Sequence, residues 1–207
     1  MNFWNEPIEE RSYSLLLQLR RDYDFVLIGG WAIFLYTKMA KSKDIDILVG
    51  YDELSRMATR LPIKKNDRLK KYETTIRGVS VDIYLPHYSN LIIAPEEIMK
   101  KTRAIEGFKV PEPEVLLALK QQAETERKGS VKGLKDRIDI LSMLLVCSLD
   151  MQKYAKFVGK SYLRMLKEIV LKAKDEFDYL EIRNLREVKK KRKKILEKID
   201  SALQNVS

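Results

Sequence analysis

Three aspartates occur in settings that suit catalysis better than simple solvation. Asp44 and Asp46 alternate with apolar residues in the run Asp-Ile-Asp-Ile-Leu-Val, so on a β-strand both side chains leave the same face, about 7 Å apart at Cα. Asp82 is flanked in the same way in Val-Asp-Ile-Tyr. If the two strands pair in register, three carboxylates converge and their negative charges repel one another. Two divalent cations would relieve that repulsion and promote in-line displacement at phosphorus.

The remaining residue types narrow the kind of metal that such a site could hold. The chain contains one cysteine, Cys147, and one histidine, His87. This excludes an internal disulfide framework, a cysteine-based zinc site and most hydrolases that use a histidine relay. Any metal must then be held by carboxylate oxygens, which are the ligands that a hard ion such as Mg²⁺ prefers.

A glycine pair lies between the first predicted strand and the helix that follows it. The apolar run 25–28 predicts a buried strand, Gly29 and Gly30 come next, and residues 31–39 have a helical pattern. Glycines at such a turn let the backbone approach a phosphate closely, with the N–H groups of the helix N-terminus facing the anion. Alone, the pair is equally typical of an ordinary tight turn. Its combination with the Asp-x-Asp run and the later aspartate is far more specific.

This order of motifs resembles the DNA polymerase β-like nucleotidyltransferase superfamily, and within it the abortive-infection, type IV toxin branch. The superfamily pattern is a Gly-Gly or Gly-Ser turn, an Asp-x-Asp pair and a third aspartate on a later strand. The matching segments are Ile28-Gly-Gly-Trp-Ala32, Ser42-Lys-Asp-Ile-Asp-Ile-Leu48 and Val81-Asp-Ile-Tyr84. The branch usually carries Arg-x-Thr before the Asp pair. This chain has Ala40 and Ser42 there, with Lys41 and Lys43 as substitutes for the arginine.

The resemblance implies a metal-dependent transfer of a nucleoside monophosphate from an NTP to an acceptor hydroxyl, with release of pyrophosphate and with two Mg²⁺ ions as cofactors. It implies catalytic and metal-binding roles for Asp44, Asp46 and Asp82. It implies nucleotide contacts for Gly29, Gly30, Ser42, Lys43, Lys120 and Asp136. The branch further implies a toxin-like role, with an antitoxin protein as a partner.

Two of the nucleotide-binding candidates have structural alternatives. The branch has a lysine on one helix and a Lys-Asp pair that opens the next, which Lys120 and Lys135-Asp136 match. Lys120 could instead lay its stem along apolar surface with its ammonium in water. Asp136 and Asp139 could form ion pairs that orient Lys120 without taking part in chemistry.

The chain is basic, with a net charge of +10, and much of the surplus lies in one segment. Residues 183–198 contain nine basic and two acidic residues. The uninterrupted basic run 189–194 must be largely exposed on a helix, and such a density favours a polyanionic partner. RNA, including tRNA, is therefore a candidate acceptor, with contacts from Lys189, Lys190, Lys193 and Lys194. The alternatives are a solvated helix face and a protein acceptor.

The remaining patterns predict the elements that position these residues. Residues 1–110 predict an α+β domain, taken from the resemblance as the nucleotidyltransferase catalytic domain, with a mixed β-sheet flanked by helices. Residues 111–207 predict an all-α domain with a basic C-terminal helix. Strands are expected at 25–28, 44–49, 72–77, 79–85 and 102–110. Helices are expected at 7–21, 31–39, 52–61, 95–101, 113–127, 131–148, 150–158, 160–174 and 183–204.

Some classes of protein are disfavoured by composition. No apolar run approaches the roughly 18 residues of a membrane span, and the N-terminus lacks the basic and apolar regions of a signal peptide, so a cytoplasmic protein is expected. A catalytically inactive module of the same fold, binding RNA or a partner protein, is the main alternative. Retention of all three aspartates argues against it. A transferase that acts on a small molecule such as an aminoglycoside favours an acidic acceptor pocket. The basic surplus of this chain therefore argues against that class.

Overall fold

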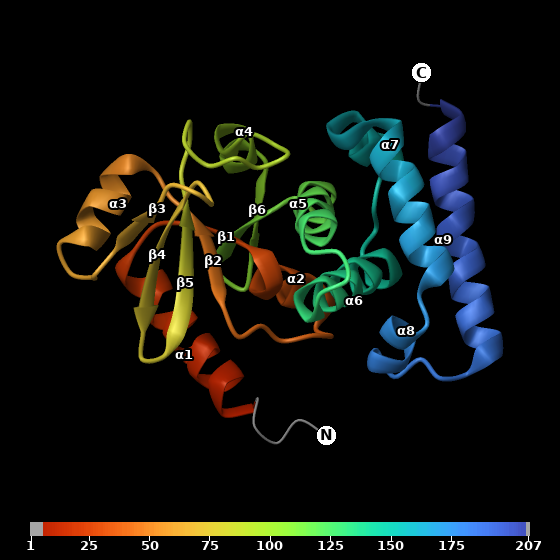
Figure 1. Cartoon of the computed structure of the whole chain (residues 1–207), viewed down its shortest axis with the longest axis horizontal. Helices are drawn as coiled ribbons and strands as arrows, with labels where there is room; N and C mark the ends of the chain where they lie inside the picture. Colours follow the sequence, from red (N-terminus) through yellow and green to blue (C-terminus); the bar gives the residue numbers. More distant parts are fainter. Residues whose placement is uncertain (1–5, 206–207) are drawn as a thin grey trace. The chain divides into compact units, whose positions relative to one another are not determined.

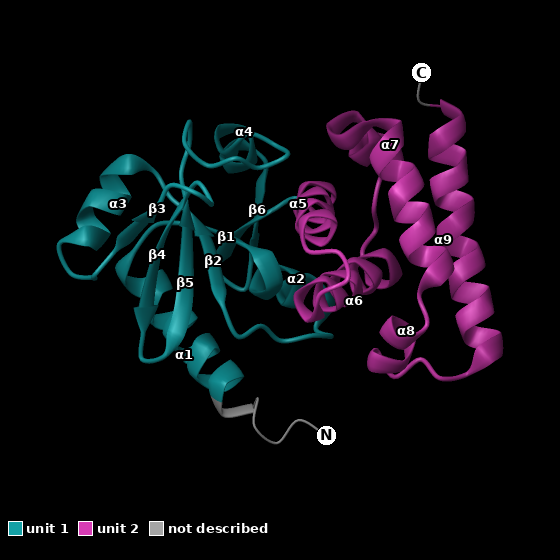
Figure 2. Ribbon diagram, viewed as in Figure 1, with its two compact units in different colours: residues 1–112 teal, residues 113–207 magenta. Residues whose placement is uncertain are grey.

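The computed structural model describes residues 6–205 of the chain. It contains two units, residues 1–112 and residues 113–207 (Figure 2). The first is built on a mixed β-sheet with helices, and the second is helical (Figure 1), so the predicted α+β fold with a C-terminal helical region is confirmed. Among residues 6–205, no helix combines the length and the apolar character that crossing a membrane requires.

The sheet of the first unit has the strand order β3-β4-β5-β2-β1-β7-β6. β2 pairs in parallel with β5, and β1 with β7, while the other neighbouring pairs are antiparallel. Because side chains alternate between the faces of a strand, the isoleucines beside Asp46 enter the core and are fully buried. The strands are β1 (Val26–Ile28), β2 (Ile45–Leu48), β3 (Lys64–Asn66), β4 (Lys71–Ile76), β5 (Val79–Tyr84), β6 (Thr102–Ile105) and β7 (Phe108–Pro111).

The helices of the first unit hold the glycine turn against the sheet. α2 packs on β1 and β2 and begins at the glycine pair itself rather than at Trp31. Trp31 is buried, and its Nε1 donates a hydrogen bond of 2.9 Å to Ser12 Oγ on α1. The turn before α2 is therefore fixed from both sides. The helices are α1 (Glu6–Asp22), α2 (Gly29–Thr37), α3 (Tyr51–Ala58) and α4 (Pro95–Lys100).

Two parts of the sheet differ from the prediction. The single strand expected at 102–110 is wrong: residues 102–111 form the β6–β7 hairpin, because Glu106 and Gly107 turn the chain with φ values of 50° and 78°. Positive φ at both central residues is the geometry of a two-residue hairpin turn. Strand β3 was not predicted, since its Lys-Lys-Asn sequence has no apolar residue to mark it.

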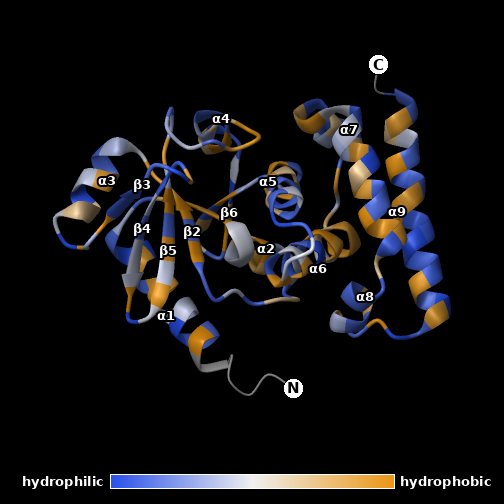
Figure 3. Ribbon diagram, in the orientation of Figure 1, coloured by the Kyte–Doolittle hydropathy of each residue, from blue (hydrophilic) through white to orange (hydrophobic). Residues whose placement is uncertain are grey.

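The second unit consists of packed helices with a short additional one. α5 packs on α6 and α7, and α7 packs on α9. Two helical segments of α7 meet at Gly159, whose φ is 76°, as the two helices expected at 150–158 and 160–174 suggested. α9 shows alternating apolar and polar positions along its length (Figure 3). The helices are α5 (Pro113–Glu126), α6 (Val131–Val146), α7 (Met151–Lys172), α8 (Asp175–Tyr179) and α9 (Leu185–Asn205).

Candidate active site

A row of carboxylates crosses three neighbouring strands of the sheet. Asp46 on β2 is the register partner of Asp82 on β5, and Asp82 is in turn the register partner of Glu73 on β4. Directly opposed residues project from the same face of a sheet, on strands about 4.8 Å apart. All three residues are half-buried. The strands that carry Asp46 and Asp82 thus pair in register, as the sequence suggested.

Asp44 lies at the approach to this row. It precedes the first residue of β2 and is half-buried, while the neighbouring Lys43 is exposed. The Ser42 hydroxyl donates a hydrogen bond of 3.0 Å to the Asp44 carbonyl oxygen. This bond shapes the turn that leads into β2, so Ser42 has a structural role in addition to its predicted contact with a nucleotide.

The glycine pair is packed directly against Asp46 and Ser42. Gly29 has φ of +67°, and a Cβ placed on it would lie 2.1 Å from Asp46 Oδ2. A Cβ on Gly30 would lie 2.6 Å from Ser42 Oγ. Both distances are far inside van der Waals contact, so the turn accepts no side chain at either position while these two side chains stay in place. The structure therefore brings together four of the residues that the sequence singled out.

Sequence reasoning missed two charged residues of this site, Lys71 and Glu73. The Lys71 ammonium forms an ion pair with Asp82 Oδ2 and lies 3.8 Å from Glu73 Oε2. The Lys71 side chain is only 13% exposed, so its positive charge is held at the row of carboxylates. The signal was present in the predicted hairpin: counting back across the turn at Gly78 places Glu73 opposite Asp82.

The donor set of the site fits a hard divalent cation, because it offers carboxylate oxygens only. Asp44, Asp46 and Asp82 are the residues that would hold Mg²⁺. Within residues 6–205, no group of three or more His, Cys, Asp or Glu side chains lies close enough together to hold a metal ion in the present arrangement. At the Asp82 end of the row, the Lys71 ammonium supplies the positive charge that a metal ion would otherwise supply.

Lys120 and Asp136 belong to the second unit and take part in a buried ionic cluster between α5 and α6. The Lys120 ammonium lies 3.1 Å from Asp136 Oδ1 and 3.1 Å from Asp139 Oδ2. Arg127 reaches the other Asp136 oxygen at 2.9 Å, and Lys135 lies 2.5 Å from Asp139 Oδ1. Both carboxylates are almost fully buried. The structural alternative, in which the aspartates orient Lys120, accounts for these contacts; a contact with nucleotide stays a prediction.

The four lysines proposed to contact nucleic acid all lie on α9 and are exposed. Lys190 and Lys194 line a groove beside the end of α6, whereas Lys189 and Lys193 do not. Lys193 lies 3.9 Å from Glu197 on the same helix.

Comparison with known proteins places the fold but not the family. No protein-family model matches the chain, and no curated protein matches it. Among solved structures, JHP933 from Helicobacter pylori is similar with a TM-score of 0.55 and 15% identity, over 95% of this chain and 93% of that one. A candidate nucleotidyltransferase from H. pylori is similar with a TM-score of 0.52 and 16% identity, over 95% of each chain.

A third solved structure is more distant. An antigenic nucleotidyltransferase-like protein from Paracoccidioides brasiliensis has a TM-score of 0.45 and 18% identity, over 84% of this chain and 92% of that one. The two H. pylori structures match this chain along almost its whole length, across both units. The chain therefore has a nucleotidyltransferase-like fold.

Proposed function

We propose that this protein is a nucleotidyltransferase that moves a nucleoside monophosphate from an NTP to an acceptor hydroxyl. The acceptor oxygen forms a bond to the α-phosphorus, the bond from that phosphorus to the bridging oxygen breaks, and pyrophosphate leaves with the electron pair. The hydroxyl proton passes to a carboxylate, for which Asp82 is the candidate. Mg²⁺ held by Asp44, Asp46 and Asp82 would neutralise charge on the phosphates.

The chain's own residues have distinct parts in this proposal. The backbone of Gly29 and Gly30 would receive the triphosphate at the start of α2, where N–H groups point outward. Ser42 and Lys43 would add contacts to the phosphates. Lys71 must leave Asp82 before that carboxylate can bind a cation or accept a proton, so substrate binding would rearrange the Lys71 side chain.

One observation carries the proposal: the glycine turn lies directly against Asp46, and Asp46 is the register partner of Asp82. A phosphate-binding turn and two carboxylates on adjacent strands are what metal-assisted phosphoryl transfer needs. The nucleotidyltransferase-like fold supports the same reading. A toxin-like role with a neutralising partner protein stays a prediction from the resemblance.

The test is transfer of label from each α-³²P-labelled NTP, with Mg²⁺, to RNA and protein from a cell extract. The wild-type chain should label an acceptor with one NTP, and Asp46→Asn should reduce labelling by about a hundredfold or more, because it removes a metal ligand with little change in shape. The matched control is Asp24→Asn. Asp24 precedes the other end of β1 and forms an exposed pair with Lys109, so this variant should label normally. Equal labelling by wild type and Asp46→Asn would refute the proposal.

A second function is favoured by one specific observation. Lys71 forms an ion pair with Asp82 and so neutralises part of the row of carboxylates without a metal ion. A catalytically inactive module of this fold would keep the aspartates for this stabilising ion pair rather than for metal binding. Such a module would bind RNA or a partner protein without turnover. It predicts that Mg²⁺ and NTP together leave the melting temperature unchanged, whereas an enzyme whose native state binds them is stabilised.

A further inference from the structure

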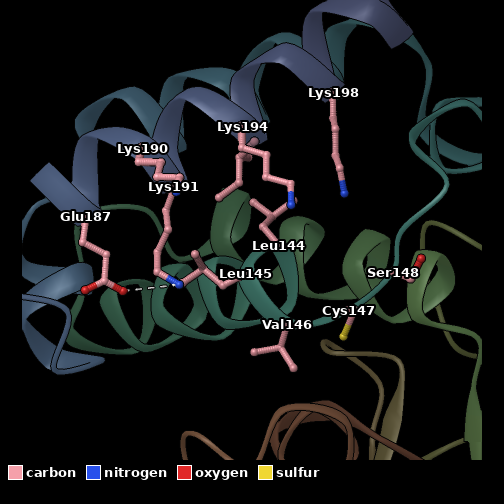
Figure 4. Close-up of a pocket in the computed structure, with 11 residues that line it drawn as sticks. Leu144, Leu145, Val146, Cys147, Ser148, Glu187, Lys190, Lys191, Lys194 and Lys198 are labelled. Carbon is pink, nitrogen blue, oxygen red and sulfur yellow. Dashed lines mark ion pairs between the residues drawn. The ribbon is translucent and has the colours of Figure 1, made fainter.

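A groove of about 550 Å³ lies in the second unit, between α9 and the C-terminal end of α6 with the residues that follow it (Figure 4). Leu144, Leu145 and Ile195 give it apolar walls. One acidic residue, Glu187, lines it. Its basic lining residues are Lys190, Lys191, Lys194 and Lys198. The lining therefore carries a net charge of +3 over apolar walls.

The lysines form a line along the helix. Lys190, Lys194 and Lys198 recur every four residues, so successive charges are about 6 Å apart along the axis and span roughly 12 Å. Figure 4 shows the Lys194 and Lys198 side chains extending from α9 toward α6. Lys191 lies 3.5 Å from Glu187. The other three make no ion pair with any residue in the part of the chain that the structure describes.

We propose that this groove binds the phosphodiester backbone of an RNA strand. A row of three uncompensated charges is unfavourable by self-repulsion. A single phosphate would offset one or two of them, whereas a strand with regularly spaced phosphates offsets the whole row and releases counterions. The apolar walls can cover sugar edges. The residues described as lining the groove include no aromatic side chain, so base stacking is absent and binding should depend little on sequence.

The choice of RNA rests on the proposed function, because an RNA strand offers a 2′-hydroxyl at every nucleotide in addition to the terminal 3′-hydroxyl that DNA also has, and so presents more acceptor hydroxyls. The charges of the groove attract a nucleic-acid backbone whether or not catalysis occurs. The set of contacting lysines differs from the one expected from the sequence: Lys198 lines the groove, while Lys189 and Lys193 lie outside it.

This division supplies a matched pair of variants for the test. Lys194→Gln with Lys198→Gln removes two charges from the groove, and Lys189→Gln with Lys193→Gln removes two charges from elsewhere on α9. The probe is a fluorescein-labelled 20-nucleotide single-stranded RNA, measured by fluorescence anisotropy between 50 and 200 mM salt. The melting temperature of each variant verifies that it is folded. A DNA strand of the same sequence and an oligoglutamate of equal charge serve as competitors.

We expect the groove variant to weaken RNA binding at least fivefold more than the control variant. Its salt slope should fall by about 1.4 log units, because each lost phosphate contact on a single strand removes about 0.7. Equal losses in the two variants, or no loss in either, would overturn the proposal.

Stronger competition by DNA would overturn the assignment to RNA, and competition by oligoglutamate as strong as by RNA would assign the groove to an acidic protein instead. Asp46→Asn should bind RNA like the wild type, so failure of transfer and failure of the groove are distinguishable.

Discussion

The Asp46 carboxylate depends on the absence of a side chain at Gly29. Two separate features require glycine at position 29: its φ is positive, and a Cβ at this position would overlap the Asp46 carboxylate. Any residue other than glycine would meet backbone strain and would also displace the carboxylate. The glycine pair is therefore explained by a specific contact as well as by turn geometry.

We predict that Gly29→Ala destabilises the fold more than Gly78→Ala does. Both glycines have positive φ, at +67° and +78°, so alanine costs about 1–2 kcal/mol of backbone strain at each. At Gly78 nothing lies within 4 Å of the added Cβ, whereas at Gly29 the Cβ meets Asp46. Overpacking should add roughly 1–3 kcal/mol there. Urea unfolding measures both changes, and equal losses would show that the contact with Asp46 has no energetic weight.

Lys71 should compete with Mg²⁺ for the row of carboxylates. Replacing it with methionine leaves Asp82 and Glu73 without their ammonium partner, so Lys71→Met should melt below the wild type in EDTA. Millimolar Mg²⁺ should then raise its melting temperature more than that of the wild type, because a tenfold tighter ion adds up to about 1.4 kcal/mol of stabilisation.

Lys65→Met is the control for this experiment. It removes the same charge from an exposed pair with Asp67 on the adjacent strand β3 and the turn that follows it, so its response to Mg²⁺ should match that of the wild type. Equal responses to Mg²⁺ in Lys71→Met and Lys65→Met would contradict competition at this site.

Cys147 should be a poorly reactive thiol in the native protein. Burial, with a smaller contribution from the charge of Glu114, raises the pKa of the Cys147 thiol to about 11. The thiolate is the reactive form, and an ordinary cysteine has a pKa near 8.5, so at pH 8 the native alkylation rate should be at least about a hundredfold below the rate in urea. The native rate should keep rising tenfold per pH unit up to pH 10. A native rate that levels off near pH 9 would contradict the shift.

At the scale of elements, α5 and α6 are joined by the ionic cluster around Lys120. Lys120→Met leaves two buried carboxylates with one basic partner each, Arg127 for Asp136 and Lys135 for Asp139. Removing one partner of a buried charge cluster costs about 3 kcal/mol, which urea unfolding of the whole chain would detect. An exposed lysine of the same region, Lys128, provides the control, and Lys128→Met should lie within about 0.5 kcal/mol of the wild type. A loss below 1 kcal/mol in Lys120→Met would mean that the cluster is not structural.

Elements with a clear apolar period could be predicted from the sequence, and those without one could not. The apolar run at 25–28 predicted β1, and the alternation around Asp46 predicted β2. The hairpin about Gly78 predicted β4 and β5. Burial of one or both faces of a strand imposes these patterns. β3 is a short polar strand, and α8 is a five-residue helix rich in acidic residues. Both are defined by their neighbours rather than by their own composition. The β6–β7 turn was missed because a Glu-Gly turn is a weaker signal than Asn-Gly.

In the candidate site too, residues that belong to a sequence pattern could be predicted, and residues placed only by the course of a side chain could not. The aspartates and glycines could be identified because their types and spacing form a pattern. Glu73 could have been added by counting the hairpin register, but the ion pair of Lys71 could not. Lys71 lies on β4 two residues before Glu73 and reaches Asp82 diagonally on the adjacent strand β5, and only the actual course of its long side chain determines which carboxylate it contacts. The groove on α9 depends on which face of the helix packs on α7, which the basic run alone did not reveal.

At the scale of the whole molecule, charge is divided unequally between the two units. Residues 113–207 contain 22 basic and 14 acidic residues, against 18 and 16 in residues 1–112. The first unit thus holds the carboxylates proposed for chemistry, and the second holds most of the positive charge proposed to attract a polyanion. Attraction of this kind is screened by salt. Binding of RNA to the second unit should therefore weaken with ionic strength much more than binding of Mg²⁺ to the half-buried carboxylates of the first unit.

The most direct test of the proposed transferase site is a crystal structure with Mg²⁺ and an NTP analogue whose α–β bridge cannot be cleaved. We predict triphosphate density on the backbone of Gly29 and Gly30, Mg²⁺ between that density and the carboxylates of Asp46 and Asp82, and Lys71 withdrawn from Asp82. If the analogue at saturating concentration leaves the Lys71–Asp82 pair intact and no nucleotide lies at the glycine turn, the claim that this site transfers nucleotides is contradicted.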